Sequence, residues 1–240
     1  MEFHIDGEPK DISRYVFCPG SRSRAKRIAE HFEELKVVNE RRGIVVYSGL
    51  YKGVFMTSCG TGIGGPLAAI AVEELGHLGA DTFIRVGSCG VLKKGQKPGD
   101  IIIASGTVRH GGTGNTYLPV EYPAVPTFEI TQELVSVAAD LGIPVRVGVG
   151  IASDGFHSFQ DGEDFKRIME TEPIFIEMES DTVFIVGAKR GFRTGALFAS
   201  DGTPEEIKPD EGKEAFFRGV DDSIGIALKA MHSIANKDRS

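Results

Sequence analysis

One charged side chain stands where the sequence leads us to expect only apolar ones. Arg85 is flanked by Ile84 and Val86, and Ser88 follows shortly after it. A buried guanidinium must be paired, because an isolated charge is very costly to remove from water. Its partner is either a structural carboxylate or a bound anion, and we favour the anion.

A second candidate anion site lies near the N-terminus. The apolar pair Val16-Phe17 is followed by Pro19-Gly20, and then by a helix-forming stretch that contains Arg24. Backbone N–H groups at the start of a helix, together with a nearby guanidinium, are suited to bind a phosphate. Taken alone, this segment is equally compatible with a solvated helix N-terminus.

Two carboxylates follow an apolar run that begins at Ile174. Strand alternation predicts that Glu177 and Glu179 share one face. Because the preceding run is apolar on both faces, we expect at least one carboxylate to enter a buried pocket. A carboxylate accepts two hydrogen bonds, which suits a cis-diol such as that of a ribose. A structural ion pair is the alternative.

A further acidic residue, Asp201, closes the apolar run that ends at Ser200. Ligands collect at the carboxyl ends of strands in open α/β sheets. Asp201 is therefore a candidate site residue, and a turn or helix-capping role is the alternative.

Glycine spacing between Gly60 and Gly65 matches the fingerprint of dinucleotide-binding proteins. The strand before it is predicted to be the second arm of a hairpin, and the next strand ends without an acidic residue that could hold a ribose hydroxyl. We therefore interpret these glycines as a tightly packed strand-to-helix turn.

Strand-like and helix-like segments alternate along the chain, which predicts one α/β domain over residues 1–240 with a mixed sheet covered by helices. Strands are expected at Ile44–Ser48, Val54–Ser58, Phe83–Val86, Ile101–Ala104, Val145–Ile151, Ile174–Met178 and Ala196–Ala199. Helices are expected at Gly65–Leu78, from a cap at Thr131 to Gly142, at Thr182–Lys189 and from about Lys213 to Ala235. The glycine- and proline-rich stretch Gly106–Glu129 is predicted to be a binding or assembly loop, or else a plain surface loop.

Composition restricts the class of protein. A net charge of −7 argues against a nucleic acid or an anionic membrane as partner. No apolar run approaches the ~20 residues of a membrane helix, and the N-terminus has no secretory pattern, so a cytoplasmic protein is expected. Three cysteines without metal-ligand spacing are predicted to be buried thiols.

Taken together, these motifs resemble the nucleoside phosphorylase-I family, which contains hexameric purine nucleoside phosphorylases and uridine phosphorylase. The resemblance covers nearly the whole chain. It is carried, in order, by PGSRSRA at Pro19, NERRG at Asn39, GTGIGGP at Gly60, IRVGSCG at Ile84, EMES at Glu177 and SDG at Ser200.

The resemblance implies a fold, an assembly and a site. The fold is a mixed, distorted barrel-like sheet flanked by helices, and the assembly is a hexamer built as a trimer of dimers with shared active sites. Phosphate would be held by Gly20, Arg24, Arg42, Arg85 and Ser88, and ribose by His4, Met178 and Glu179. The base would be contacted by Phe156, Gln160, Glu177, Ser200 and Asp201. His4 and Arg42 would come from a neighbouring subunit.

The implied reaction is phosphorolysis of a nucleoside to a free base and ribose 1-phosphate, with Arg85 and Asp201 as catalytic residues and with neither a metal nor an organic cofactor. A hydrolytic nucleosidase, a dehydrogenase and a non-catalytic nucleoside-binding protein are the rival classes. The aspartate matches the purine branch, so inosine and guanosine are the expected substrates and uridine is the alternative. Gln160 aligns with a glutamine that grips uracil, but the arginine expected two positions later is Gly162. An arginine that supports the acid in bacterial purine enzymes also lacks a clear equivalent, and Lys208 and Lys213 are the candidates to replace it.

Overall fold

A computed structural model describes residues 2–157, 162–203 and 212–239. The strands are β1 (Tyr15–Phe17), β2 (Glu33–Asn39), β3 (Val45–Tyr51), β4 (Val54–Gly60), β5 (Thr82–Val91), β6 (Ile101–His110), β7 (Val145–Ser153), β8 (Phe175–Glu177) and β9 (Arg193–Ser200). The α-helices are α1 (Arg22–Ala29), α2 (Gly65–His77), α3 (Phe128–Asp140), α4 (Glu163–Glu170), α5 (Ser180–Arg190) and α6 (Lys213–Lys237). The described residues also form two short 3-10 helices, η1 (Pro9–Asp11) and η2 (Thr113–Thr116).

The nine strands form one mixed sheet in the order β2-β3-β4-β1-β5-β8-β7-β6-β9. An additional pairing of β5 with β9 closes the last five strands into a barrel, and the first four extend from it. Parallel pairs such as β1–β5 and β5–β9 occur beside antiparallel ones such as β5–β8 and β6–β9. The predicted α/β class with a mixed, barrel-like sheet is confirmed.

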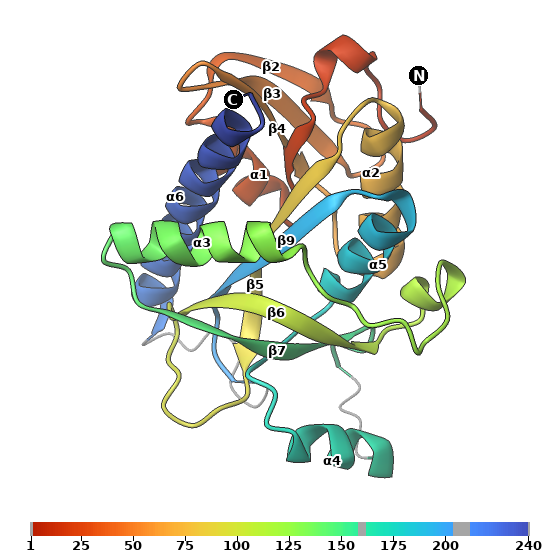
Figure 1. The fold of residues 1–240 in the computed structure, drawn as a ribbon, viewed down its shortest axis with the longest axis vertical. Helices are drawn as coiled ribbons and strands as arrows, with labels where there is room; N and C mark the ends of the chain where they lie inside the picture. Colours follow the sequence, from red (N-terminus) through yellow and green to blue (C-terminus); the bar gives the residue numbers. More distant parts are fainter. Residues whose placement is uncertain (1, 158–161, 204–211, 240) are drawn as a thin grey trace.

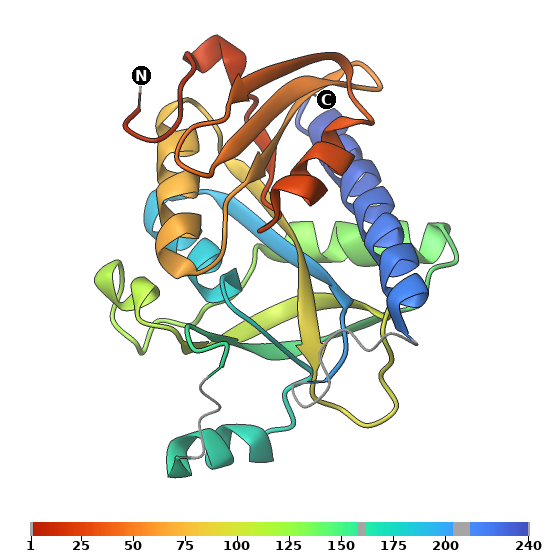
Figure 2. The same ribbon diagram turned by 180° about the vertical axis from the view of Figure 1, so that it is seen from behind.

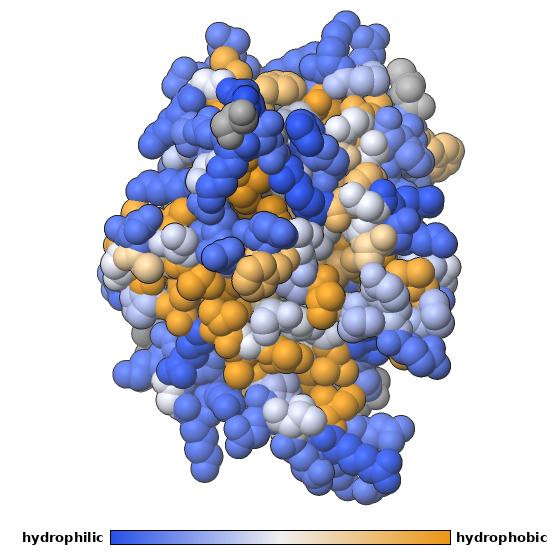
Figure 3. Space-filling model, viewed as in Figure 1, coloured by the Kyte–Doolittle hydropathy of each residue, from blue (hydrophilic) through white to orange (hydrophobic). Residues whose placement is uncertain are grey.

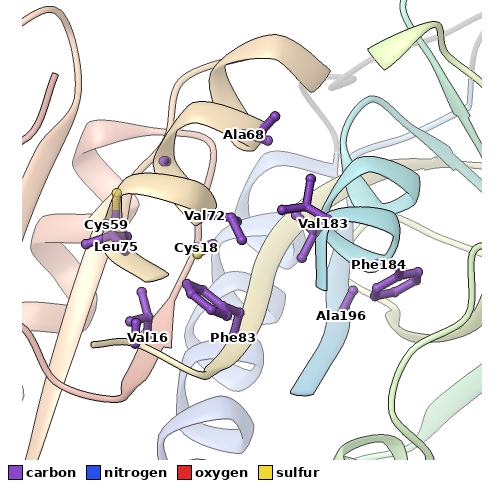
Figure 4. Close-up of a cluster of buried hydrophobic side chains, with 14 of the residues drawn as sticks. Val16, Cys18, Cys59, Ala68, Val72, Leu75, Phe83, Val183, Phe184 and Ala196 are labelled. Atoms are coloured by element: carbon purple, nitrogen blue, oxygen red, sulfur yellow. The ribbon is translucent and has the colours of Figure 1, made fainter. Parts of the chain in front are cut away.

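Helices cover this sheet on two sides (Figures 1 and 2). One core cluster joins α2 and α5 to the sheet, and Figure 4 shows Val72 and Leu75 of α2 close to Phe83 of β5. A second cluster joins α1, α3 and α6 to the sheet, with Ile28 and Met231 fully buried. Helix α4 lies apart, at one end of the molecule.

Strand β5 is the central element of this arrangement. Its residues from Thr82 to Gly87 are all buried, as expected for a strand enclosed on both faces. It runs parallel to β1 on one side and to β9 on the other, with Phe17 opposite Ile84 and Ser88 opposite Ala199. The carboxyl ends of three parallel strands therefore meet at one edge of the sheet.

Several predicted boundaries are corrected by the structure. Helix α3 begins at Phe128 after an N-cap at Thr127, and not at Thr131, because the backbone of Thr127 is held in an extended conformation by hydrogen bonds to Thr194. The first five residues of the segment Gly106–Glu129 continue β6 instead of forming a loop. Strand β2 and helix α4 were not predicted, since β2 has an exposed, charge-rich sequence and α4 is short.

The glycine turn and the cysteines match their predictions. A Cβ atom on Gly60 would lie 2.8 Å from Val45, and one on Gly65 would lie 2.6 Å from Thr113, so the turn is tightly packed. All three cysteines are buried free thiols. Among the described helices, none is long and apolar enough to cross a membrane.

Candidate active site

A cavity of about 860 Å³ opens at the edge where β1, β5 and β9 end. It is bounded by the loop before α1, the second half of β5, the β7–α4 connection, the β8–α5 junction and the start of α6. Its lining includes Gly20, Arg24, Ile63, Arg85, Ser88, Phe156, Met178, Glu177, Glu179, Asp201, Lys213, Phe216 and Phe217. Most residues predicted to form a site are therefore brought together.

Arg85 forms the charged centre of this cavity. Its Nε atom donates to Glu177 at 2.9 Å, and its Nη2 atom donates to Glu179. All three side chains are at most 5% exposed. Burial lowers the pKa of Arg85, but the charges of Glu179 and Glu177 outweigh it, and the net shift is upward. The guanidinium is therefore paired with carboxylates while it also borders an open cavity.

The two carboxylates reach Arg85 by different routes, which corrects the prediction that strand alternation places them on one face. Strand β8 ends at Glu177, and Glu179 is the N-cap residue of α5. Glu177 also accepts hydrogen bonds from the backbone of Glu179 and from the backbone and hydroxyl of Ser180. Glu177 thus fixes the turn that aims Glu179 at the cavity.

Glu179 is additionally held by the glycine turn. The backbone N–H of Gly64 donates to its Oε1 atom at 2.5 Å. Burial raises the pKa of Glu179, and the charge of Arg85 opposes that shift without cancelling it. The turn that resembles a dinucleotide fingerprint therefore positions a carboxylate.

Arg24 provides a second buried cation at the same end of the cavity. Its Nη1 atom donates to the carbonyl of Val86 at 3.2 Å, while its Nε atom has no hydrogen-bond partner in the described part of the chain. Burial, and then the charge of Arg85, lower its pKa to about 10. Helix α1 is capped by the Ser21 hydroxyl, which accepts from the Arg24 backbone. A bound anion would relieve this concentration of positive charge.

Asp201 follows the last residue of β9 and lines the cavity. Its backbone N–H donates to the carbonyl of Cys89 at 3.0 Å. Its charge opposes the downward shift of the Arg24 pKa, so the two side chains are within electrostatic reach. Ser200, by contrast, is fully buried and is not part of the described lining.

Aromatic side chains also line the cavity. Phe156 and Phe217 line it and are 54% and 52% exposed, while Phe216 is buried. Met178, which lies between Glu177 and Glu179 in the sequence, is half-buried. Gln160 and Lys208 lie outside the described residues.

Two predicted site residues lie elsewhere on this chain. Among the residues that the structure describes, His4 and Arg42 do not line the cavity. Arg42 follows β2 and has a left-handed backbone with a φ of 51°. Arg22, which lies within the PGSRSRA motif, is exposed and also outside the lining.

Sequence reasoning missed several residues around this site. Asp181 is 1% exposed, and burial followed by the charge of Glu177 raises its pKa to about 7. Ser180 donates hydrogen bonds to Glu177, and Phe217 lines the cavity. The only sequence signal for Phe217 was its place beside the inward-facing Phe216. Within the described ranges, no group of three or more histidine, cysteine, aspartate or glutamate side chains is arranged to hold a metal ion.

Comparison with known proteins shows the family. The model of the phosphorylase superfamily matches residues 14–235. The chain is 38% identical over 233 residues to a uridine phosphorylase of Thermococcus kodakarensis, covering 90% of this chain and 83% of that protein. It is 37% identical over 241 residues to a guanosine phosphorylase of Halorubrum lacusprofundi, covering 96% and 98%.

A solved structure agrees with these sequence relatives. The crystal structure of uridine phosphorylase from Vibrio fischeri ES114, complexed with 6-hydroxy-1-naphthoic acid, superposes with a TM-score of 0.87 at 30% identity. The match covers 94% of each chain. This protein belongs to the phosphorylase superfamily.

Proposed function

We propose that this protein cleaves the N-glycosidic bond of ribonucleosides with inorganic phosphate, and that it prefers 6-oxopurine nucleosides such as inosine and guanosine. Its family supports the reaction class, because the relatives described above are nucleoside phosphorylases. The observation that carries the proposal is one cavity lined by two buried arginines, by the carboxylate Glu179 and by the acid Asp201.

The arginine end of the cavity suits phosphate. Arg24 and Arg85 are both buried, and Arg24 has an unsatisfied Nε donor in the described structure. Phosphate oxygens accept several charge-assisted hydrogen bonds, which are stronger than neutral ones. Gly20 and Ser88 border the same space. A phosphate bound here is held as the nucleophile.

Glu179 is suited to hold the sugar. One of its oxygens accepts from Gly64 and the other pairs with Arg85, which fixes the carboxylate plane beside the phosphate end. A ribose that donates hydroxyl groups to it is oriented with C1′ toward the phosphate, and such orientation lowers the entropic part of the barrier. Negative charge on phosphate also stabilises the positive charge that develops on the sugar.

The base leaves as an anion unless it receives a proton. Asp201 lines the cavity at the end of β9 and serves as the proton donor to N7 of a purine. Lys213, at the start of α6, lines the same cavity and adds a positive charge there. The guanosine phosphorylase of Halorubrum lacusprofundi, which is similar over nearly its full length, supports a purine substrate.

Uridine is the second candidate, because the Thermococcus protein and the Vibrio structure are uridine phosphorylases. The residue at which the family has an arginine for uracil is the exposed Gly162, and a Cβ atom placed on it would have no described atom within 4 Å. A site without that charged donor stabilises a uracil anion less well. For this reason we place purine nucleosides first.

We also propose that the enzyme assembles as a hexamer with shared active sites, because His4 and Arg42 lie outside the cavity of their own chain. Exposed apolar side chains are available for assembly. Figure 3 shows such side chains gathered over β6 and β7, where Val147 and Val149 are 47% and 46% exposed.

The decisive experiment is to incubate the protein with inosine, guanosine and uridine, each with and without phosphate. We expect phosphate-dependent release of base and ribose 1-phosphate, with kcat/KM higher for the purine nucleosides. Equal rates without phosphate, yielding free ribose, would assign the protein to the hydrolytic nucleosidases. A higher kcat/KM for uridine would reverse the order of the two substrate candidates.

A further inference from the structure

We propose that Glu74 is a positioning residue, which holds His4 with its proton on Nδ1 so that Nε2 accepts a hydrogen bond from a ribose hydroxyl in the cavity of a neighbouring copy of the chain. The inference rests on the proposed function for the identity of the sugar and for the sharing of sites. The arrangement of Glu74 and His4 within one chain stands independently of it.

Glu74 is a buried carboxylate in α2, and it accepts hydrogen bonds from the N-terminal segment. Its side chain is 9% exposed. The Oε2 atom accepts from the backbone N–H of Ile5 at 2.8 Å, and both oxygens lie within 3.1 Å of the backbone nitrogen of His4. The Oε1 atom lies 2.6 Å from Nδ1 of His4. The histidine is thus fixed through both its backbone and its ring.

These contacts determine the tautomer of the histidine. Both oxygens of Glu74 receive backbone N–H donors, as an ionised carboxylate does, so the proton in the 2.6 Å contact belongs to Nδ1 of His4. In a neutral imidazole the other nitrogen, Nε2, is then an acceptor. A ribose hydroxyl has a proton to donate, so it is a suitable partner for Nε2.

Arg42 lies on the same edge of the molecule. The ring of Phe3 stacks edge-on against His4 with 4.8 Å between ring centroids, and the Arg42 guanidinium lies 4.5 Å from the centre of the same Phe3 ring. Phe3 is 68% exposed. The two residues expected to act in a neighbour's cavity therefore both contact Phe3, although they are far apart in sequence.

The neighbouring residue Glu73 supplies a matched control. It lies in the same helix and forms an ion pair with Arg190 instead of contacting the N-terminal segment. Glu73→Gln removes a carboxylate from α2 without altering the contacts of His4. Glu74→Gln retains the size of the side chain, but its amide group cannot accept all of the N–H groups that the carboxylate accepts.

The first test is spectroscopic and needs no substrate. In full-length protein labelled with ¹⁵N in histidine, we expect His4 to show the Nδ1-protonated tautomer, and we expect this signature to be lost in Glu74→Gln and kept in Glu73→Gln. The assignment of the signal comes from its absence in His4→Ala. An Nε2-protonated His4 in the unaltered protein would overturn the proposal, whatever the enzyme acts on.

The second test connects the ring to the reaction. We measure kcat and KM for inosine and for its 2′-, 3′- and 5′-deoxy analogues. Glu74→Gln should raise the KM for inosine about tenfold, which is the effect of losing one hydrogen bond. It should also reduce the discrimination against one of the deoxy analogues. The KM for phosphate should be unchanged. Glu74→Asp should restore part of the discrimination, and Glu74→Gln should add nothing in a His4→Ala background.

Additive effects of the two substitutions, with equal losses for every analogue, would mean that Glu74 only stabilises the fold, and the proposal would fail. If His4→Ala leaves nucleoside kinetics unchanged while the tautomer is as expected, the sharing of sites in the proposed function is wrong, and the role of Glu74 toward the sugar fails with it. The two measurements therefore separate a failure of the local arrangement from a failure of the assembly.

Discussion

The two ends of the cavity are constructed differently. At the end that the proposed function assigns to phosphate and sugar, which we call the phosphate-and-sugar end, Arg85, Glu177 and Glu179 are nearly inaccessible and are connected by hydrogen bonds from three separate elements. In the part of the cavity that the proposed function assigns to the base, Phe156 and Phe217 are about half exposed.

On the proposed function, the difference follows from what each end binds. Charges buried in a cavity are stable only when their partners are fixed, and fixed dipoles and charges are also what stabilises a transition state. An aromatic wall binds a planar base through the apolar area that it covers and not through directional hydrogen bonds, so it can remain partly exposed to solvent. We infer that the first end determines the reaction and the second determines the choice of base.

The largest expected effect comes from breaking the buried end. Arg85→Ala leaves Glu177 and Glu179 without their cation, which should cost roughly 3–5 kcal/mol of stability and lower kcat/KM by at least about 10²-fold. Urea unfolding and phosphate-dependent kinetics measure the two losses.

Arg24→Ala is the comparison for that variant. Because Arg24 has a depressed pKa and an unpartnered Nε atom in the described structure, its loss should raise the KM for phosphate about tenfold or more with little change in stability. If Arg24→Ala destabilises the protein as much as Arg85→Ala does, the carboxylate partners of Arg85 do not make it more important for stability than Arg24.

The next effect tests the acid at the base end. Asp201→Asn retains the shape of the side chain but removes its proton, so inosine cleavage should fall about 10²-fold, as is common for a lost general acid. An artificial substrate whose base leaves without protonation should be affected much less. Inosine cleavage that survives the substitution would remove Asp201 from the mechanism and would weaken the purine assignment.

The smallest effect concerns Asp181, which lies behind the phosphate-and-sugar end. Its pKa in the folded protein is about 7, whereas an unfolded aspartate titrates near 3.9. Between these values the folded state binds more protons, so stability falls as the pH rises from about 4 to about 7 and remains lower above that range. Asp181→Asn removes this loss.

We therefore expect the Tm of Asp181→Asn to exceed that of the unaltered protein by several degrees at pH 8 and to approach it near pH 4, since one pKa unit corresponds to about 1.4 kcal/mol. Asp222→Asn, which changes an exposed carboxylate in α6 whose pKa is also raised by partial burial and by the charge of Asp221, should show a smaller difference of the same sign. A constant difference between pH 4 and pH 8 for Asp181→Asn would mean that Asp181 does not titrate in this range.

Local sequence was sufficient to predict most elements and several site residues. Long apolar runs predicted β5 and β9, and helical periodicity predicted α2 and α6, because these patterns depend on neighbours along the chain. The start of α3 was predicted wrongly, because a distant strand holds Thr127 in its extended conformation. Strand β2 and helix α4 lacked an apolar pattern strong enough to predict them.

Sequence alone determined that the buried Arg85, and at least one of the carboxylates that follow Ile174, needed partners, since an unpaired charge in an apolar run is too costly to exist. Only the tertiary structure decided that they pair with one another, that Glu179 reaches Arg85 from a helix terminus and not from a strand, and that Glu74 holds His4. These pairings join residues 70 or more positions apart, and such contacts follow from the order of strands in the sheet and the packing of helices on it.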